Sequence, residues 1–504
     1  MHSNKDWFKD RGYPHFSNKT PIRVRRRIEE YISDEKKIAK HSFSPLIFKE
    51  IKQRRYKLSS FNGVERRSHK KLKNGKVISN LKIREILYAT HIDSHVYSYY
   101  TQKIISPKYE LKLKSDNTLD NAITAYRQIK TEDGLKNKNN INFAKDAFDE
   151  VKRRQNCVVL AFDIENFFPS LNHRQLKLVW AKILGLKSLP KAHYNIFKAS
   201  TNFSYVKLND LKKNIRGFDE KELSKHRKEG KNTFFDNIKS LIDSEIIIHK
   251  NQKKNQNGSL MGIPQGLPIS ALLANMYMLP FDESIVNLLV KKFNVFYRRY
   301  SDDIIMICEE NQVEFVEQFV INEINKIELI ISKEKTEKTL FKVHGGRLQC
   351  FRILNDSLKM NIPLNYLGFE FYGYQTLIKS KNLSAFYREM KMSINRKYKR
   401  VEKIKEKHLL DSPPIFKRKI YRLYSFKGVK SRKLPTKRSE FRNGILKSHS
   451  VSRKFRGNYL KYAYKASEEL EAPEIKKQLR NHWKILQTTM SKYDFSNVKS
   501  NQNE

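Results

Sequence analysis

The chain has 504 residues, enough for about two to four domains with substantial cores. It carries 101 Lys and Arg against 53 Asp and Glu, a formal net charge of +48, and an excess this large repels itself unless a polyanion neutralises it. We therefore expect a nucleic-acid partner, whose binding weakens steeply with salt because counterions are released. No run of about 18 apolar residues occurs, which argues against a membrane span and a membrane partner.

Three isolated cysteines, Cys157, Cys308 and Cys350, form neither a disulfide framework nor a zinc pattern. We expect them to pack in apolar strands. The first residues contain no apolar signal core. Together these features predict a protein of the reducing cytoplasm.

Residues 1–80 form a basic N-terminal extension with two runs of charge, Arg23–Arg27 and Arg66–Lys71. Trp7 and Tyr13–Phe16 predict a small packed element at its start. Basic residues also stand beside aromatic ones, as in Arg298–Tyr300 and Arg396–Tyr398, and such pairs can hold phosphates and stack bases.

A carboxylate ends the first strongly apolar run. Val158–Phe162 predicts a strand, and Asp163 follows it directly. Asp163 could act at the strand end or cap a helix that begins at Glu165. A long polar connection comes next, and its stretch Lys207–Asn232 is expected at the surface.

The segment Gly262–Ser270 has the sequence Gly-Ile-Pro-Gln-Gly-Leu-Pro-Ile-Ser and precedes an apolar, helix-like stretch, Ala271–Leu279. Two Pro and two Gly within seven residues predict a fixed loop whose backbone can approach a flat ligand closely. Gln265 offers a donor and an acceptor beside that path. An ordinary loop leading into a helix would explain only Pro268 and Ser270.

Two adjacent carboxylates, Asp302 and Asp303, stand between the apolar runs Val295–Tyr297 and Ile304–Ile307, which predicts the tip of a β-hairpin. Such a pair is usually a solvated turn. A doubly anionic tip on an apolar support is costly, however, unless a cation neutralises it. With Asp163, three acidic groups would suit two hard cations with oxygen ligands, such as Mg²⁺, which clamp the two oxygens of a phosphoryl transfer.

In the order Asp163, Pro264–Gly266, Tyr300–Asp303, these segments resemble the palm of reverse transcriptases. The resemblance covers residues 81–375. Ile331–Thr336 looks like the family's next motif, where Lys335 would lie near the incoming triphosphate, and Tyr366–Phe371 looks like the primer-grip hairpin. Arg84–Ile86 and Ala125–Arg127 resemble the fingers motifs, with Arg127 the better candidate for a triphosphate contact, although Lys335 and Arg127 could also be solvated basic residues.

The resemblance implies an α+β right-hand polymerase with fingers, an antiparallel-sheet palm carrying the Tyr300–Asp303 hairpin, and a basic α-helical thumb and C-terminal region. We divide the chain accordingly into residues 1–80, residues 81–375 for fingers and palm, and residues 376–504 for the thumb and basic C-terminal region. The thumb would begin with a helix in which Phe386, Met390, Ile394 and Tyr398 repeat every four residues.

Within such a site, Asp163 and Asp302 would hold two Mg²⁺, or Mn²⁺ in their place, with the main-chain carbonyl of Ile164 as an extra ligand. Asp303 would complete the anionic site, and Lys335 could protonate the pyrophosphate. The remaining predicted contacts with the nucleotide and the template come from Gln265, Gly266, Arg127 and Phe168.

Phe168 stands five residues after Asp163, where the family places its steric gate against the ribose 2′-hydroxyl. A ring there would favour deoxynucleotides and DNA synthesis. The alternative is that Phe167 and Phe168 both fill the core.

The C-terminal region is strongly basic. Residues 411–465 contain Pro413, Pro414 and Pro435 and almost no acidic residues, and we expect short helices joined by basic loops there. Ile475, Leu479 and Trp483 follow helical spacing and predict a packing helix.

Among reverse transcriptases, the Tyr13–Phe16 and Ala89–Asp93 segments and the basic C-terminal region look most like the bacterial defence-associated, abortive-infection-like enzymes. That resemblance implies an antiphage role, a dedicated noncoding RNA as template or permanent partner, dNTPs and a DNA product, and in some members a homo-oligomer. Retron-like and intron-maturase-like enzymes are alternatives. The retron signature is absent after Asn121–Thr124, and three scattered cysteines cannot build a zinc-bearing endonuclease. An RNA-binding scaffold or sensor with a silent polymerase site is a third alternative.

Overall fold

The computed structural model describes residues 6–61, 64–73, 76–213, 233–235, 238–244, 246–332, 335–354, 357–408, 417–430, 432–442, 445–455 and 457–493. It has two compact units, and strands β7 (Cys157–Asp163) and β11 (Asp303–Cys308) run through both. The first unit comprises Met1–Arg127, Ala161–Ile305 and Glu314–Thr336, and the second comprises Gln128–Leu160, Met306–Val313 and Glu337–Glu504.

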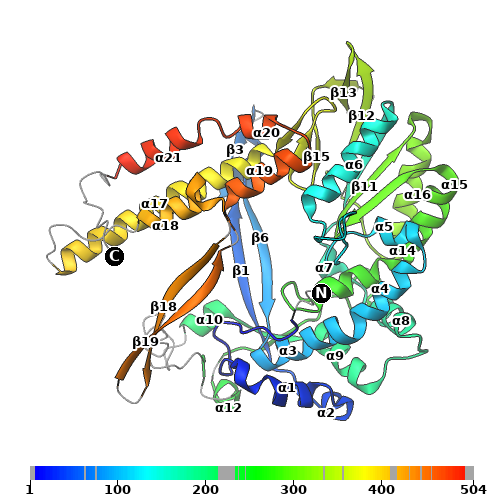
Figure 1. The fold of residues 1–504 in the computed structure, drawn as a ribbon. Coiled ribbons are helices and arrows are strands. Elements are labelled where there is room, and N and C mark those ends of the chain that lie inside the picture. Colours follow the sequence, from blue (N-terminus) through cyan, green and yellow to red (C-terminus); the bar gives the residue numbers. More distant parts are fainter. Residues whose placement is uncertain are drawn as a thin grey trace. The chain divides into compact units, whose positions relative to one another are not determined.

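The first unit mixes helices with a small sheet (Figure 1). Its elements are η1 (Ile22–Val24), α1 (Arg25–Ile32), α2 (Glu35–Ala39), β1 (Leu46–Arg54), β2 (Lys57–Phe61), β3 (Val64–Ser68), β4 (Lys70–Lys73), β5 (Lys76–Ser79), β6 (Leu81–Tyr88), α3 (His91–Tyr99), η2 (Tyr100–Ile105), α4 (Ser106–Lys114), α5 (Asn117–Ala122), α7 (Phe167–Ser170), α8 (His173–Leu184), α9 (Lys191–Thr201), β8 (Ser204–Lys207), α10 (Leu208–Lys213), α12 (Ile238–Ile242), β9 (His249–Lys250), α13 (Ser270–Tyr277), α14 (Leu279–Ile285), η3 (Val286–Val290), α15 (Lys291–Phe293), β10 (Phe296–Tyr300) and nearly all of α16 (Val313–Lys326).

The second unit holds the long C-terminal helices (Figure 1). Its elements are α6 (Asn140–Arg154), η4 (Glu310–Gln312), β12 (Glu337–His344), β13 (Arg347–Leu354), β14 (Ser357–Met360), β15 (Leu364–Tyr366), β16 (Phe369–Phe371), β17 (Thr376–Ile378), α17 (Ser380–His408), α18 (Lys417–Tyr424), η6 (Phe426–Gly428), β18 (Arg432–Arg442), β19 (Ile445–Phe455), α19 (Tyr459–Glu469), α20 (Glu474–Lys477) and α21 (His482–Ser491). The α+β class predicted from the sequence is confirmed.

The largest sheet has the strand order β10-β11-β7-β12-β13-β14. Its central strands are apolar, and Val158, Val159 and Leu160 of β7 are all fully buried. A strand buried on both faces reads as a continuous apolar run, which is the pattern of the sequence here. The three cysteines are buried and unpaired, as predicted. Burial raises the pKa of the Cys157 and Cys308 thiols to about 12, so both behave as packing residues.

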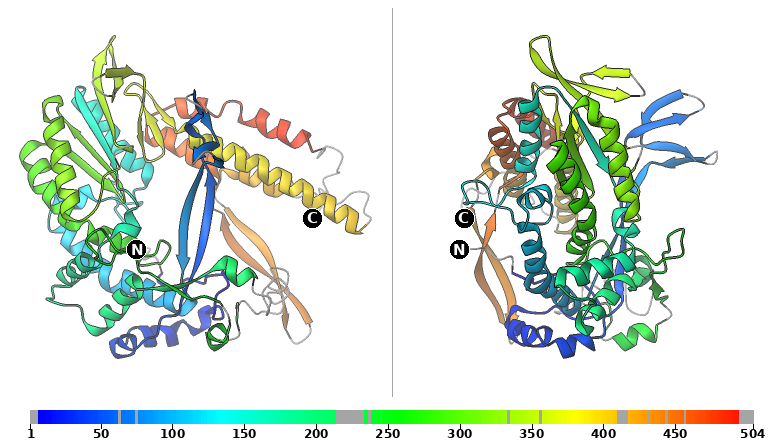
Figure 2. Two further views of the ribbon diagram at one scale, coloured as in Figure 1. Left: turned by 180° about the vertical axis from the view of Figure 1, so that it is seen from behind. Right: turned by 90° about the vertical axis from the view of Figure 1, so that its right-hand side faces the viewer.

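A long antiparallel ribbon joins β1 to β6, from Ile47 opposite Tyr88 to Arg54 opposite Leu81, and the left view of Figure 2 shows the two strands side by side. The predicted limit at residue 80 falls between these paired strands, and the division into three domains stays a prediction. Trp7 and Phe16 are buried, as predicted for the packed N-terminal element. Phe16 lies in one core cluster with Ile47 and Val206, so residues before the ribbon stabilise it.

Helix α17 covers the segment where four-residue spacing predicted a helix, and Phe386, Met390 and Ile394 are buried along it. Two predictions for the C-terminal region were wrong. Residues 432–455 form the hairpin β18–β19, with Arg442 opposite Ile445, instead of short helices. The two intervening residues in the sequence are Asn443-Gly444, a pair typical of two-residue hairpin turns, and residues 411–416 lie outside the described residues.

The predicted packing helix of the tail is interrupted, because α20 ends at Lys477 and α21 begins at His482. Ile475 and Leu479 are buried, but Trp483 is 44% exposed because the break resets the helical spacing. The stretch predicted to be exposed, Lys207–Asn232, lies outside the described residues from position 214 onward.

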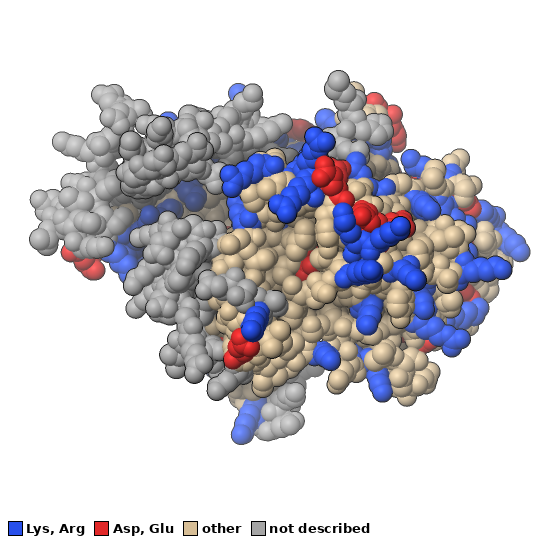
Figure 3. Space-filling view, turned by 90° about the horizontal axis from the view of Figure 1, so that it is seen from below, with Lys and Arg blue, Asp and Glu red and all other residues tan. Residues whose placement is uncertain are grey.

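On the face shown in Figure 3, Lys and Arg side chains are scattered over a described surface that consists mostly of other residues, and acidic side chains gather in a few small groups. No helix in the described ranges is long and apolar enough to cross a membrane.

The core of the first unit contains one fully buried ion pair. The Arg299 guanidinium donates to both carboxylate oxygens of Asp282, at 2.7 and 2.6 Å, and neither side chain is exposed. The Tyr297 hydroxyl also donates to Asp282, at 2.5 Å. The interpretation of Arg298–Tyr300 as a nucleic-acid contact is therefore wrong for Arg299. Burial alternates along β10, which turns Tyr297 and Arg299 inward together.

We predict that Arg299→Met lowers the free energy of unfolding by about 3–5 kcal/mol, because Asp282 would remain charged and buried without its partner. Urea denaturation measures the loss. Arg298→Met is the matched control, since the Arg298 guanidinium lies 4.4 Å from the centre of the Phe296 ring and such a contact is worth about 1 kcal/mol or less. Equal losses in the two variants would contradict the assigned role of the pair.

Candidate active site

Asp163 lies at the end of β7 beside the segment that carries Lys335. The Ser332 amide donates to the Asp163 carbonyl at 2.8 Å, and the Glu165 amide donates to the Ile330 carbonyl at 2.9 Å. Lys335 in turn forms an ion pair with the Asp163 carboxylate. The structure therefore brings together two residues that the sequence places 172 positions apart.

The turn between β10 and β11 contains Ser301 and Asp302. Ser301 is 5% exposed and has φ of 63°, a conformation that non-glycine residues adopt rarely. Its carbonyl accepts a hydrogen bond from the Arg299 guanidinium at 3.1 Å. The buried ion pair with Asp282 thus holds the turn that carries the two carboxylates.

Asp302 and Asp163 interact electrostatically. Burial raises the pKa of the Asp302 carboxyl above its ordinary value, the Asp163 charge raises it further, and the Lys335 ammonium opposes the shift. Two carboxylates that disfavour each other's charge, with an ammonium beside one of them, are a suitable place for a cation. The metal site predicted at Asp163 and Asp302 stays a prediction.

Within the described ranges, no group of three His, Cys, Asp or Glu side chains is arranged to hold a metal ion. Asp303 is exposed at the start of β11, and Ile164 is buried. Their predicted roles as further ligands, Ile164 through its main-chain carbonyl, stay predictions.

The Gly262–Ser270 loop is fixed by main-chain hydrogen bonds on two sides. The Ile263 amide donates to the Phe168 carbonyl at 3.0 Å, and the Leu87 amide of β6 donates to the Gln265 carbonyl at 2.9 Å. Gly266 has φ of 127°, and a Cβ there would collide with the Leu87 carbonyl oxygen. The close backbone approach at Gly266 is therefore to β6, the predicted approach to a flat ligand stays a prediction, and the Gln265 side chain is exposed.

The two adjacent phenylalanines have different environments. Phe167 is 4% exposed, whereas Phe168 is half-buried, and their ring centroids lie 5.6 Å apart. Phe167 is therefore the core residue of the pair. Phe168 lies next to the Gly262–Ser270 loop through its bonded carbonyl. Its role as a steric gate stays a prediction.

Arg127 is engaged inside the protein. Its guanidinium donates to both Glu110 oxygens, at 3.0 and 2.7 Å, and forms an ion pair with Asp120. It also donates to the carbonyls of Asp120 and Ile123. Because its side chain is only 3% exposed, contact with a triphosphate would require these bonds to break. The contact stays a prediction, and the geometry favours a structural role.

Two residues near the site were not singled out from the sequence. The pKa of the Lys82 ammonium on β6 is lowered, mainly by burial. The Lys335 charge also lowers this pKa, and the Asp163 charge raises it. Tyr126 has φ of 64°, is 55% exposed and lies with its hydroxyl 3.2 Å from the Ser301 hydroxyl. Strained conformations are concentrated at functional sites, so a positive φ marks Tyr126 where its sequence alone does not.

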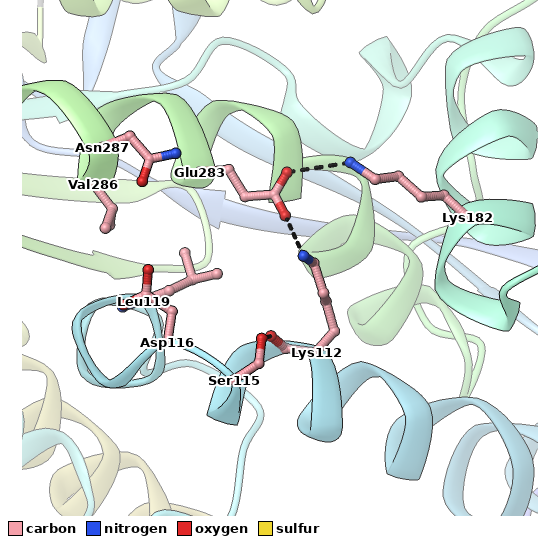
Figure 4. Close-up of a pocket in the computed structure, with 8 residues that line it drawn as sticks. All are labelled: Lys112, Ser115, Asp116, Leu119, Lys182, Glu283, Val286 and Asn287. Carbon is pink, nitrogen blue, oxygen red and sulfur yellow. Dashed lines mark hydrogen bonds and ion pairs between the residues drawn. The ribbon is translucent and has the colours of Figure 1, made fainter.

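A polar pocket elsewhere in this unit contains no reacting group (Figure 4). Glu283 accepts from Lys112 at 3.0 Å and from Lys182 at 3.3 Å. These ion pairs join α14 to α4 and α8, so we interpret the pocket as a structural junction.

Residues 205–371 match the family described as reverse transcriptase (RNA-dependent DNA polymerase). The matched segment, about a third of the chain, is therefore similar to a reverse transcriptase domain. The matched residues include Gln265, Asp302, Asp303 and Lys335, whereas Asp163 and Arg127 precede them. No curated protein sequence matches the chain significantly.

Among solved structures, the chain is similar to telomerases. It is 12% identical to apo telomerase from Candida tropicalis truncated from the C-terminal domain, with a TM-score of 0.36 over 72% of this chain and 61% of that one. Telomerase from Candida albicans in complex with a fragment of telomeric RNA gives 12% identity and a TM-score of 0.33, over 74% of this chain and 54% of that one. The chain thus spans less than two thirds of either telomerase.

We predict that Asp302→Asn stabilises the protein in buffer without divalent cations. The raised pKa of Asp302 means that burying its charge costs stability above that pKa, and a neutral amide removes this cost. Thermal unfolding should give a higher Tm for the variant at neutral pH. The difference should shrink as the pH falls through the Asp302 pKa and the native carboxyl takes up a proton. A variant that is less stable at every pH would contradict the assigned environment.

Proposed function

We propose that this chain is an RNA-directed DNA polymerase that makes cDNA by nucleotidyl transfer. The observation that carries the proposal is the association of Asp163 with both Lys335 and Asp302, since these residues come from three separate segments of the chain. The match of residues 205–371 to the reverse transcriptase family supports it independently.

Asp163 and Asp302 would hold two Mg²⁺, with the Ile164 carbonyl as an extra ligand and Asp303 completing the anionic site. When bound, such ions make the primer 3′-hydroxyl more acidic and neutralise the pyrophosphate leaving group, and Mn²⁺ could replace them. The Lys335 ammonium pairs with the Asp163 carboxylate and would have to leave it before an ion could bind there.

The other predicted residues would bind and orient the substrates. Once the Lys335 ammonium separates from Asp163, it would donate a proton to the pyrophosphate. Gln265 and Gly266 would position the dNTP and the template base on the fixed loop. For the triphosphate, Lys82 is a better candidate than Arg127, since Lys82 lies within the field of Asp163 and Arg127 is already bound to two carboxylates.

We further propose that the enzyme acts with a dedicated noncoding RNA in antiphage defence. It would work in the cytoplasm of a bacterium and could assemble as a homo-oligomer. The net charge of +48 supports a large polyanionic partner. The defence role rests on the sequence resemblance. A retron-like or intron-maturase-like enzyme would share the polymerase site and differ in the RNA that it binds.

A second candidate function is an RNA-binding scaffold or sensor whose polymerase site is silent. The ion pair of Lys335 with Asp163 favours it, because that ammonium stands where a cation would bind and no three ligating side chains are grouped in the described ranges. Phage protection by an Asp302→Asn variant that makes no DNA would establish the scaffold role.

Asp163→Asn and Asp302→Asn should each lower DNA synthesis by more than about 100-fold, since loss of even an outer partner of a metal ligand costs about 10- to 100-fold. Primer extension on an RNA template measures the loss. Asp149→Asn is the control, since its carboxylate is 45% exposed in surface ion pairs. Substantial incorporation by either active-site variant would overturn the assignment.

Phe168→Ala should increase the use of ribonucleotides relative to deoxynucleotides, because a methyl group leaves room for the 2′-hydroxyl. Competition between dNTPs and NTPs in primer extension measures the ratio of kcat/KM values. Phe167→Leu serves as the control for core packing. An unchanged ratio in Phe168→Ala would leave Phe168 a packing residue.

A further inference from the structure

The C-terminal helices enclose a cavity that the polymerase site does not use. It has a volume of about 410 Å³ and is lined by Phe426, Tyr464, Glu468, Lys476, Leu479 and Arg480. These residues belong to η6, α19, the turn after α20 and α20 itself, all within the second unit. The volume falls within the about 300–1,000 Å³ typical of pockets that take small flat ligands.

Two aromatic rings form one wall of this cavity. The rings of Phe426 and Tyr464 are nearly parallel, with an interplanar angle of 7° and centroids 6.0 Å apart. Phe426 is 45% exposed, so its ring is accessible to a ligand. Parallel, accessible rings are the arrangement on which nucleic-acid bases stack.

The turn that carries Phe426 is rigid. The buried Ser425 hydroxyl donates to the Tyr421 carbonyl at 2.6 Å and accepts from the Lys427 amide at 3.2 Å. The Asn458 amide group donates to the Ser425 carbonyl at 2.8 Å. A Cβ at Gly428 would overlap the Arg422 carbonyl oxygen, so the turn has no room to move in that direction. A ring held in this way loses little entropy when a ligand stacks on it.

Basic groups surround the rings. Lys476 lies 6.0 Å from the centre of the Tyr464 ring, and Arg480 lines the same cavity. The single carboxylate of the lining, Glu468, is 3.9 Å from the Lys476 ammonium and balances only one of these two charges. Lys427 extends the basic surface, with its ammonium 5.6 Å from the centre of the Tyr421 ring. The local excess of positive charge favours an anionic ligand.

A second aromatic pair lies on two other helices of this unit, α18 and α21. Tyr421 of α18 and Trp483 of α21 have ring centroids 6.2 Å apart with an interplanar angle of 27°, and Trp483 is 44% exposed. Successive stacking positions flanked by cations follow a single strand of nucleic acid better than they follow a peptide, whose carboxylates would leave the parallel rings unused.

We propose that this cavity binds an unpaired base of a single-stranded RNA, stacked on Phe426 and Tyr464, with Lys476 and Arg480 holding the flanking phosphates. A paired base presents only its edges in the grooves, so the platform selects loops or ends of an RNA over its duplex parts. The proposal deepens the proposed function, because it locates where the bound RNA is held; the binding itself does not require DNA synthesis.

The test uses the full chain and a uridine oligonucleotide of about 10 nucleotides, a length within the about 4–16 nucleotides of single-strand sites, with one central 2-aminopurine. Stacking quenches 2-aminopurine fluorescence, which reports the local contact even though other basic surfaces also bind RNA. We expect quenching with the native chain. Phe426→Ala and Phe426→Leu should abolish it and weaken binding by about 10-fold, in line with one stacked base. Phe426→Tyr should restore both.

The matched control is Phe315→Ala, since Phe315 is 43% exposed in the first unit and lies outside this cavity. It should keep full quenching. Lys476→Gln should retain quenching but flatten the dependence of log Kd on log salt by about one phosphate contact. The Tm of each variant checks that the fold is preserved.

Three results would overturn the proposal. These are unchanged quenching in Phe426→Ala, equal competition by duplex RNA, or displacement of the oligonucleotide by a poly-glutamate peptide but not by unlabelled single-stranded RNA. An equal response to a deoxythymidine oligonucleotide would mean that the cavity takes single-stranded DNA as well and is not specific for RNA.

Primer extension on the same variants separates this site from the polymerase site. Phe426→Ala should keep the native kcat for DNA synthesis at saturating template. If the native chain binds the oligonucleotide but makes no DNA, that result refutes the proposed polymerase activity and leaves the proposed RNA site intact.

Discussion

The turn between β10 and β11 depends on one buried ion pair. Arg299 uses its guanidinium to bind both oxygens of Asp282, the Asn275 side chain at 3.1 Å and the Ser301 carbonyl at 3.1 Å, and its own carbonyl accepts two hydrogen bonds from Thr124. Helices α13 and α14, strand β10, the turn and the segment after α5 therefore meet at one residue. A buried pair of this kind is not strong evidence for stability. The pair fixes the geometry of the turn instead, because the guanidinium makes four hydrogen bonds to three different residues.

The position of Asp302 depends on this ion pair. Once Ser301 is held, Asp302 lies in a partly buried position where Asp163 raises its pKa and Lys335 opposes the shift. The main-chain bonds from Ser332 to Asp163 and from Leu87 to Gln265 then add the lysine segment and the Pro-Gln-Gly loop to the same unit. Repulsion between the two carboxylates makes the site suited to a cation. Without a cation, the same repulsion lowers the stability of the folded protein.

Local signals predicted much of this arrangement. Continuous apolar runs located β7 and β11, and four-residue spacing located α17, because these patterns follow directly from which face is buried. Arg299 was missed because two adjacent arginines resemble a solvated surface; only the alternation of burial along β10 distinguishes them. The paired strands β2–β3, β4–β5 and β18–β19 are each separated by an Asn-Gly pair in the sequence, a hairpin signal that the prediction missed. The partners of Arg127 depend on tertiary contacts with Glu110 and Asp120, which sequence spacing does not reveal.

The most direct test of the central claim is to purify the native chain and the Asp302→Asn variant from a native host and to sequence the RNA and DNA bound to each. The account predicts one predominant RNA in both samples, with DNA complementary to that RNA only in the native sample. DNA without a matching RNA would indicate untemplated synthesis. RNA without DNA in both samples would contradict the polymerase and favour the binding scaffold.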